Sequence, residues 1–118
     1  MRDQGTIQTA LRQLEAIRSE KLPRLGLASR TKNYNLEWLE AVEVEVMLDV
    51  AEMIARASLA RQESRGAHYR VDYPTEDNDR WLVNLVMRQE GGRMEIERRP
   101  VALSKVGLDR DRKDQRSD

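Results

Sequence analysis

Cysteine and phenylalanine are missing from this chain of 118 residues, and other aromatic side chains are scarce. Without cysteine there is no disulfide bond and no thiol chemistry, which fits a reducing compartment. The core must therefore be built mainly from aliphatic side chains. Hydrophobic residues make up 39% of the chain and charged residues 36%, so that core is thin. A single domain of this size and composition is expected to be marginally stable alone.

An excess of charge of one sign is missing as well. Twenty-one Lys and Arg residues balance 21 Asp and Glu residues, which argues against a nucleic-acid partner, because affinity for nucleic acid rests on neutralising phosphates. No apolar run approaches the roughly 20 residues of a membrane-spanning helix. Residues 1–5 do not have the pattern of a signal peptide. We therefore expect a soluble, cytoplasmic protein with no direct insertion into a membrane.

The first part of the chain predicts a helix that starts near Thr6, whose hydroxyl is a suitable N-cap. Pro23 is expected to end this helix or kink its last turn, because proline lacks the N–H and restricts the residue before it. Residues 25–33 are expected to form a loop. The apolar positions of the helix recur at spacings of three and four. They are Ile7, Leu11, Leu14 and Ile17.

A second, longer helix is predicted from residue 36 to about residue 64, with Asn35 as its N-cap. Acidic residues crowd its start and arginines its end, as the helix macrodipole favours. One apolar stripe comprises Leu39, Val42, Val46, Val50, Met53, Ala57 and Ala60, and an adjacent one comprises Ala41, Val44, Leu48, Ala51, Ala55 and Leu59. An apolar arc this wide is covered from more than one side. Because the first helix can cover only one side, we expect a neighbouring helix or a second copy of the chain on the other.

A β-hairpin is predicted at about residues 81–99. A polar turn at residues 77–80 precedes it, Gly91 and Gly92 supply the positive φ angles of its tight turn, and Pro100 lies where an edge strand would end. Residues 104–118 are nearly all charged or polar and are expected to be a disordered tail. The sequence thus predicts a mainly α fold: an incomplete antiparallel helical bundle followed by a small hairpin, in one domain spanning residues 1–103.

The loop at residues 63–74, between the long helix and the hairpin, carries the candidate functional side chains. His68 is a candidate catalytic base, but no Ser, Cys or metal-ligand cluster stands at a motif spacing, so a structural histidine at an interface is favoured. Arg65 and Arg70 could grip a carboxylate substrate, although salt bridges at a helix end or interface are the favoured interpretation. One histidine and no cysteine argue against zinc, and four glutamates near the start of the long helix are better explained as partners of its dipole than as a cation site. No Gly-rich phosphate loop is present to hold a dinucleotide.

The order of these motifs resembles the C-terminal domain of succinate dehydrogenase and fumarate reductase flavoprotein subunits. The block Glu63-Ser64-Arg65-Gly66-Ala67-His68 leads to Asp72-Tyr73-Pro74, then to an acidic turn at residues 77–79 and to the pair Trp81-Leu82. Residues 35–44, 47–52 and 55–57 also match this family, and L-aspartate oxidases carry a related block. Val71 and residues 83–85 depart from the family pattern.

The resemblance implies a spectrin-like three-helix bundle with a strand-bearing extension, packed on a flavin domain. Residues 1–5 would be the tail of the bundle's first helix, so this chain would supply two helices of three. In the family, FAD and the dicarboxylate are held by other domains, which implies no catalytic, cofactor-binding or metal residue here. The expected partners are the FAD-binding domain, an iron–sulfur subunit and a further copy of the chain, in a complex peripheral to the inner face of the membrane. The residues expected to brace the FAD-binding domain are Arg65, His68, Tyr69, Arg70, Asp72 and Tyr73.

Two other functions are open from the sequence alone. The exposed apolar arc of the long helix would also suit an autonomous interaction or dimerisation module. A small enzyme dependent on a metal or on His68 is a third possibility, and it is the one that the residues support least.

Overall fold

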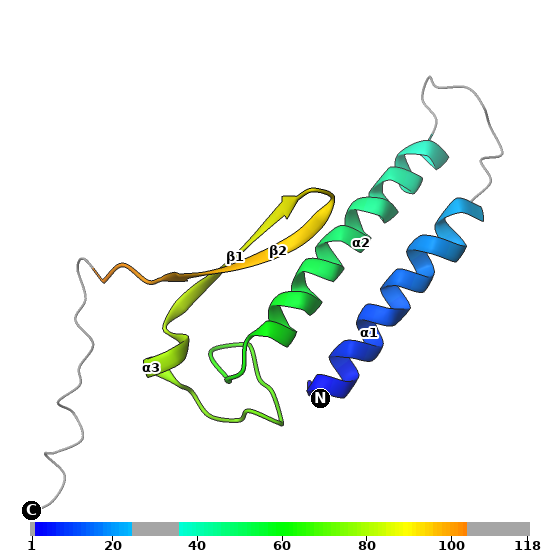
Figure 1. The fold of residues 1–118 in the computed structure, drawn as a ribbon. Helices are drawn as coiled ribbons and strands as arrows, with labels where there is room; N and C mark the ends of the chain where they lie inside the picture. The colour runs from blue at the N-terminus through cyan, green and yellow to red at the C-terminus, as the bar shows by residue number, and fades with distance from the viewer. Residues whose placement is uncertain (1, 25–35, 104–118) are drawn as a thin grey trace, which may run out of the picture.

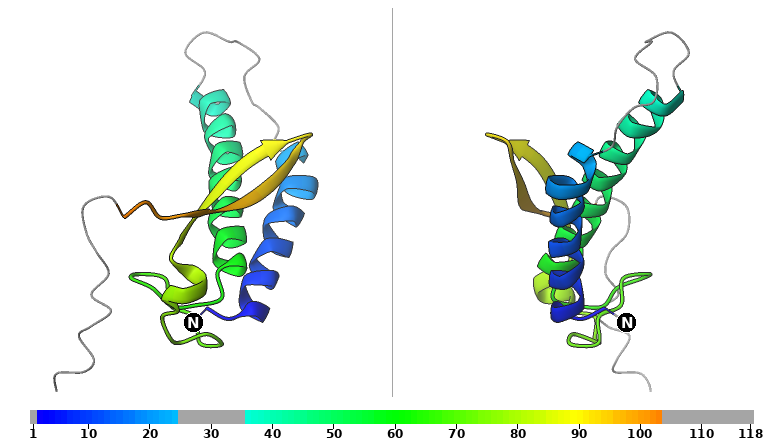
Figure 2. Two further views of the ribbon diagram at one scale, coloured as in Figure 1. Left: turned by 60° about the vertical axis from the view of Figure 1, so that its left-hand side comes forward. Right: turned by 90° about the vertical axis from the view of Figure 1, so that its right-hand side faces the viewer.

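The computed structural model describes residues 2–24 and 39–103 in full, and residues 36–38 by their backbone alone. Two helices, α1 (Gln4–Ala16) and α2 (Leu36–Ala60), lie side by side and run in opposite directions (Figure 1). A one-turn helix, α3 (Asn78–Trp81), leads to an antiparallel hairpin of β1 (Val83–Glu90) and β2 (Arg93–Pro100). The hairpin lies on one face of the helical pair, and its tip stands away from that pair (Figure 2). The predicted mainly α fold with a small hairpin is confirmed.

The first helix starts earlier than the sequence predicted. Asp3, not Thr6, is the N-cap: its carboxylate accepts a hydrogen bond from the Thr6 amide at 2.8 Å, and the Thr6 hydroxyl accepts one from the Asp3 amide at 3.0 Å. This reciprocal pair is a capping box, in which a carboxylate takes the N-cap position. It also places Gly5 inside α1, so the expectation that residues 1–5 end a preceding helix is wrong.

Proline distorts the end of the first helix, as predicted. After α1 the chain widens into a π-helical turn, Ile17–Lys21, and then tightens into a 3₁₀ turn, Leu22–Arg24, which contains Pro23. A change of hydrogen-bond register is one way for a helix to absorb a proline, whose ring cannot supply an N–H. The loop expected at residues 25–33 and the N-cap expected at Asn35 lie outside the described residues.

One side of α2 packs on α1 and the other does not. Leu48 on α2 and Ile7 on α1 are buried, and the stripe that contains Leu48 is half-buried along its length. Arg18 joins the helices by pairing with Asp49 at 2.8 Å and Glu52 at 3.3 Å. The other stripe is exposed from Leu39 to Met53. The prediction that the first helix covers only one face is confirmed, whereas the expected second cover is not tested.

The long helix ends at Ala60 rather than near residue 64, and the expected polar turn at residues 77–80 is partly the helix α3, capped by the Asp77 carboxylate. The hairpin agrees closely with its prediction, since Gly91 and Gly92 have φ angles of 56° and 77° and β2 ends at Pro100. Trp81 belongs to α3 rather than to β1, and it is buried. The expected charged tail lies outside the described residues. Within residues 2–24 and 36–103, no helix is both long and apolar enough to cross a bilayer.

Candidate functional site

The loop at residues 63–74 lies where three elements meet: the end of α2, the start of α1 and α3. It contains a tight turn closed by two backbone hydrogen bonds between Arg65 and His68, of 2.8 and 2.9 Å. Gly66 is the turn residue that needs no side chain, because its φ is 55°, in the left-handed region. An added Cβ there would meet nothing within 4 Å, so the requirement for glycine comes from the backbone angle alone.

Glu63 is the ionic centre of the loop and is 0% exposed. Its carboxylate accepts hydrogen bonds from Arg65 at 2.9 and 3.1 Å and from the Asp77 amide at 2.9 Å, and it also pairs with Arg61. Burial by itself would raise the pKa of this carboxyl group, but the bonds from Arg65, Asp77 and Arg61 outweigh burial and lower the pKa. Glu63 is therefore a fixed anion that holds the end of α2 to the start of α3.

Two arginines that pair with Glu63 also bind residues at the base of the hairpin or just before it. Arg61 donates to the carbonyl oxygens of Trp81 at 3.0 Å and Val83 at 2.7 Å, and its guanidinium lies 5.6 Å from the Trp81 ring centroid. Arg98 of β2 covers the same indole at 4.1 Å. Arg65 continues to the Asn78 side-chain oxygen at 2.7 Å and to Glu76. The base of the hairpin is thus fixed to the loop by side chains whose charges are already paired or stacked.

Arg70 is a buried arginine, 1% exposed, that caps the C-terminus of α2. Its Nη1 donates to the carbonyl oxygens of Ser58, Leu59 and Arg61 at 3.2, 2.8 and 3.0 Å. These carbonyls belong to the end of a helix, where no following amide is available to them. The other two nitrogens donate to Asp72 at 2.9 and 2.5 Å. All three nitrogens are engaged within the chain and the side chain is buried, so Arg70 does not present its guanidinium fork to a carboxylate substrate.

Asp72 connects Arg70 to the N-terminus of α1. Its Oδ2 accepts a hydrogen bond from the Gln4 amide at 3.0 Å, in the first turn of α1, where the helix dipole favours an anion. The pKa of the Asp72 carboxyl group is lowered to about 2, mainly by the hydrogen bonds from Arg70 and further by the bond from the Gln4 amide. The neighbouring amide of Val71 donates to the Arg2 carbonyl at 2.8 Å. We call Arg70 and Asp72 together the helix-end clamp, because they connect the end of one helix to the start of the other.

His68 and Tyr69 differ sharply in their surroundings. The His68 Nε2 atom is buried and has no hydrogen-bond partner in the described part of the chain. Burial is the largest cause that lowers the pKa of this imidazole, followed by the positive charges of Arg2 and Arg61, so the ring is neutral at pH 7. Tyr69, directly after it, is 54% exposed. The loop therefore exposes the Tyr69 side chain and half-buries the His68 imidazole.

The six residues expected at an interface are brought together in this loop, but with different environments. Arg70 is buried and Asp72 is bound to it, Tyr73 lies under the Arg70 guanidinium at 4.7 Å, and Arg65 is bound to Glu63. Only Tyr69 offers a large exposed side chain. Reasoning from the sequence missed Glu63 and Arg61 as members of this network. The alternation Arg61-x-Glu63-x-Arg65 at a helix end was the signal that could have found them.

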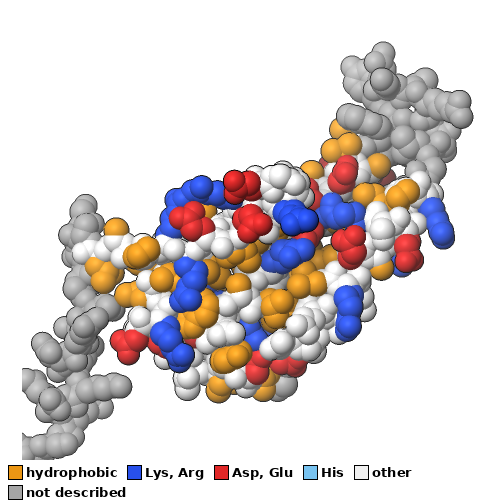
Figure 3. Space-filling model, in the orientation of Figure 1, with side chains coloured by type: hydrophobic (Ala, Val, Ile, Leu, Met, Phe, Trp, Pro, Cys, Tyr) orange, Lys and Arg blue, Asp and Glu red, His pale blue; other side chains and the backbone are white. Residues whose placement is uncertain are grey.

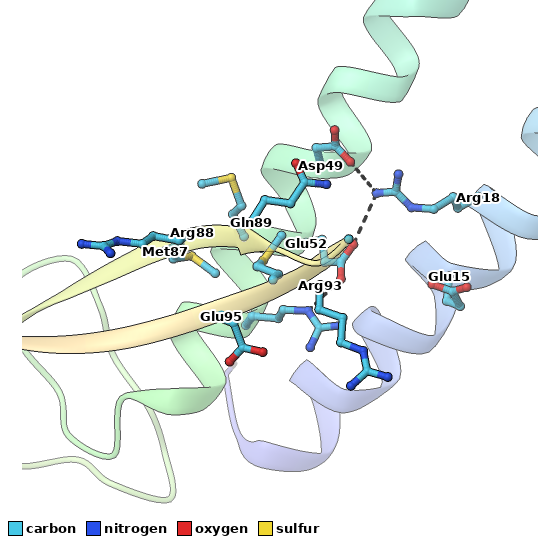
Figure 4. A pocket seen from close by; sticks show the side chains of 13 residues that line it. Glu15, Arg18, Asp49, Glu52, Met87, Arg88, Gln89, Arg93 and Glu95 are labelled. Atoms are coloured by element: carbon cyan, nitrogen blue, oxygen red, sulfur yellow. Dashed lines mark hydrogen bonds and ion pairs between the residues drawn. The ribbon is translucent and has the colours of Figure 1, made fainter.

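A separate cleft of about 760 Å³ lies between the hairpin and the two helices. Figure 4 shows side chains from both helices and from the tip of the hairpin pointing into it, with Arg18 bridging to Asp49 and Glu52. Arg56 takes the other oxygen of Glu52 at 2.7 Å, and three methionines form the apolar part of the lining. The cleft carries acidic and basic side chains in equal number. No group of three or more His, Cys, Asp or Glu side chains in the described residues could hold a metal ion. The lining residues are Glu15, Arg18, Asp49, Glu52, Met53, Arg56, Met87, Arg88, Gln89, Gly92, Arg93, Met94 and Glu95.

Comparison with known proteins points in one direction. The family model described as "Fumarate reductase flavoprotein C-term" matches residues 1–116. The fumarate reductase flavoprotein subunit of Haemophilus influenzae is 35% identical over 105 residues, which are 88% of this chain and 17% of that protein. The fumarate reductase flavoprotein subunit of Mycobacterium tuberculosis is 32% identical over 105 residues, 88% of this chain and 18% of that protein. The chain thus spans less than a fifth of the length of these relatives.

Solved structures show the same similarity. The FrdA chain of E. coli quinol fumarate reductase matches with a TM-score of 0.82 and 26% identity, over 90% of this chain and 18% of that chain. A chain of the Mycobacterium smegmatis Sdh1 complex in its apo form matches with a TM-score of 0.72 and 31% identity, over 84% of this chain and 17% of that chain. The arrangement of two helices, loop and hairpin is therefore one that recurs as a part of larger chains.

Proposed function

The chain belongs to the family of fumarate reductase and succinate dehydrogenase flavoprotein C-terminal domains, and from that premise we propose that it is a structural domain that packs on the FAD-binding domain of its parent flavoprotein. The parent would be an FAD-dependent oxidoreductase that interconverts succinate and fumarate. FAD and the dicarboxylate would be held outside these residues. On this proposal no residue of this chain takes part in hydride or proton transfer.

The observation that carries the proposal is that Arg70 and Glu63, the buried charged groups of the loop, are paired within the chain. Arg70 donates from all three of its nitrogens within the chain, and Glu63 accepts from three residues. A substrate dicarboxylate needs arginine donors that are free to approach it in pairs, and a general base needs an accessible lone pair within reach of a proton. Arg70 and Glu63, which are 1% and 0% exposed, supply neither. Their chemistry is that of a rigid support.

The surface that the support presents is centred on Tyr69. An exposed tyrosine on a rigid backbone loses little conformational freedom on binding and is a frequent anchor at interfaces. Val71, 43% exposed, lies two residues away. In this proposal Arg65, His68, Arg70, Asp72 and Tyr73 brace the FAD-binding domain indirectly, by holding the loop in shape, while Tyr69 makes the contact.

Two measurements test the proposal. Isothermal titration of the purified chain with FAD and with succinate should give no binding, and stoichiometric FAD binding at micromolar affinity would refute it. In the full-length parent flavoprotein, the photo-crosslinking residue p-benzoylphenylalanine at position 69 should crosslink to the FAD-binding domain. The same residue at position 103, in place of the exposed Leu103, is the matched control and should not reach that domain. Absence of a crosslink from position 69 would remove Tyr69 from the interface.

The expected wider assembly extends this proposal. An iron–sulfur subunit would bind the parent rather than this domain alone, and the complex would lie on the inner face of a membrane, with this domain on the cytoplasmic side. The alternative function, an autonomous dimerisation module, draws on the exposed apolar side of α2, but family membership favours the flavoprotein domain. Sedimentation of the purified chain separates them in part, because an ordered monomer contradicts the dimerisation module.

A further inference from the structure

The two-stranded hairpin is fastened to the rest of the chain at its base. Arg61 donates to the carbonyl oxygen of Val83 at 2.7 Å, and Arg98 covers the Trp81 ring. Among the described residues, no hydrogen bond or ion pair joins residues 84–100 to α1 or α2. An isolated two-stranded hairpin is marginally stable in water. The outer part of this hairpin therefore depends on the apolar side chains that it packs against α2.

Methionine supplies the apolar contact at the outer part of the hairpin. Met53 of α2, Met87 of β1 and Met94 of β2 all line the cleft between the hairpin and the helices, and of the described residues in that lining only these three have apolar side chains. Met87 lies opposite Ile96 and Met94 opposite Gln89, so Met87 and Met94 share one face of the hairpin. Figure 4 shows Met87 and other sulfur-bearing side chains where the hairpin passes in front of α2.

The cleft leaves these sulfur atoms within reach of small solutes. Its volume is about 760 Å³, Met53 is 39% exposed, and Met87 and Met94 are half-buried. Figure 3 shows apolar side chains open to solvent among charged ones on the face that carries the hairpin. Peroxides oxidise the thioether of methionine to a sulfoxide, which is polar and disrupts methionine-rich contacts. The side chains that hold the outer hairpin are therefore ones that a peroxide can change.

We propose that Met53, Met87 and Met94 form a modification site for hydrogen peroxide, at which oxidation to sulfoxides releases the outer part of the hairpin from α2. We call these three residues the methionine latch. The proposal does not rest on the proposed function, because it uses only contacts within this chain.

The oxidation is a transfer of one oxygen atom and two electrons at each sulfur. A sulfur lone pair attacks one oxygen of hydrogen peroxide, the O–O bond breaks and a sulfur–oxygen bond forms. The other oxygen leaves as water after one proton has moved to it, so the sulfur is oxidised and the peroxide is reduced. Methionine sulfoxide reductases return the thioether, with electrons from thiols outside this chain, which makes the change reversible.

Hydrogen–deuterium exchange of the full chain, measured before and after treatment with hydrogen peroxide, tests the methionine latch. Once mass spectrometry shows an added oxygen on all three methionines, the backbone amides of residues 83–100 should exchange at least about tenfold faster. Amides of the loop at residues 63–74 should change by less than about twofold, because they belong to a separately held part of the structure. Methionine sulfoxide reductases A and B together, one for each sulfoxide epimer, should restore slow exchange.

Met47 provides an internal control. It is 64% exposed on α2 and does not line the cleft, so Met47→Leu should respond to peroxide as the wild type does. The triple substitution Met53→Leu, Met87→Leu and Met94→Leu keeps the apolar volume and should hold the hairpin both before and after peroxide. Met87→Gln, which replaces a thioether by a polar amide, should speed exchange without peroxide. Circular dichroism checks the helices of each variant.

Unchanged exchange of residues 83–100 after all three methionines have been oxidised would overturn the proposal. So would loss of the peroxide response in Met47→Leu, or a response of the triple variant as large as that of the wild type. An untreated hairpin that exchanges at the rate of unprotected amides would also overturn it, because there would then be no contact to release. None of these outcomes alters the FAD titration or the crosslink from position 69, so this proposal and the proposed function can fail separately.

Discussion

Replacing Arg70 by alanine is the most direct test of the helix-end clamp. The side chain is 1% exposed and donates to three carbonyl oxygens at the end of α2 and to both oxygens of Asp72. Breaking a buried ion pair by removing one partner costs about 3–5 kcal/mol. The Asp72 side chain is 29% exposed, so it recovers part of its hydration when Arg70 is removed. We therefore expect the lower end of that range, about 3 kcal/mol of the free energy of unfolding.

Urea unfolding followed by far-UV circular dichroism at pH 7 measures this loss. With an m-value of about 2 kcal/mol/M, usual for a small domain, the midpoint of Arg70→Ala should fall by about 1.5 M. Arg70→Lys should lose about half as much, because an ammonium keeps the charge but cannot supply the planar fork that spans the helix end and Asp72.

The control is Arg80→Ala, which removes an arginine that is 81% exposed and paired with Asp77 at 2.7 Å. A surface pair of this kind contributes less than about 1 kcal/mol. If Arg70→Ala lowers the midpoint no more than Arg80→Ala does, the clamp does not stabilise the fold and the account of the loop as a rigid support is refuted.

Three further predictions concern the same loop. The pKa of Asp72 is about 2 in the folded chain, against 3.8 ordinarily, so its contribution to stability is complete above about pH 4 and is lost as the pH falls toward 2. Urea midpoints measured from pH 5 to 2 should therefore fall less steeply for Asp72→Asn than for the wild type. Parallel curves for the two proteins would contradict this. The pKa of His68 should lie below its ordinary 6.5 in an NMR titration, since burial and nearby arginines disfavour the imidazolium, and a value at or above 6.5 would place the ring in solvent. Gly66→Ala should destabilise the chain by about 1–2 kcal/mol in urea unfolding, because its φ is 55°, and Gly66→Asn should lose less; equal midpoints for wild type and Gly66→Ala would show that the turn rearranges.

Regular patterns in the sequence predicted the regular parts of the fold. The apolar spacing of α2 predicted a helix because it matches helical periodicity, and the pair Gly91–Gly92 predicted a tight turn because glycine accepts positive φ angles. The start of α1 was predicted less well, because Asp3 and Thr6 are both of residue types that favour the N-cap position. Here the stronger acceptor, Asp3, takes the N-cap position.

The loop could not be predicted in the same way because its contacts join residues far apart in the chain. The end of α2 at Ala60 depends on Arg70, ten residues later, which takes the carbonyl oxygens of the last turn. The role of Glu63 depends on the Asp77 amide, fourteen residues away. From the sequence Glu63 had no assigned contact, and Arg70 was expected only to form a salt bridge at a helix end or an interface. Their placement required the path of the chain between them.

The helix-end clamp also limits how the length of this chain can vary. Arg70 and Asp72 must reach α2 and α1 at the same time, with the Val71 amide bound to Arg2 between them. One inserted or deleted residue between Ser64 and Arg70 would move Arg70 and Asp72 away from their partners on α2 and α1 and release both helices together. The hairpin turn at Gly91–Gly92 is exposed and lies apart from the helix-end clamp, so additional sequence, such as an epitope or a fluorophore tag, belongs there.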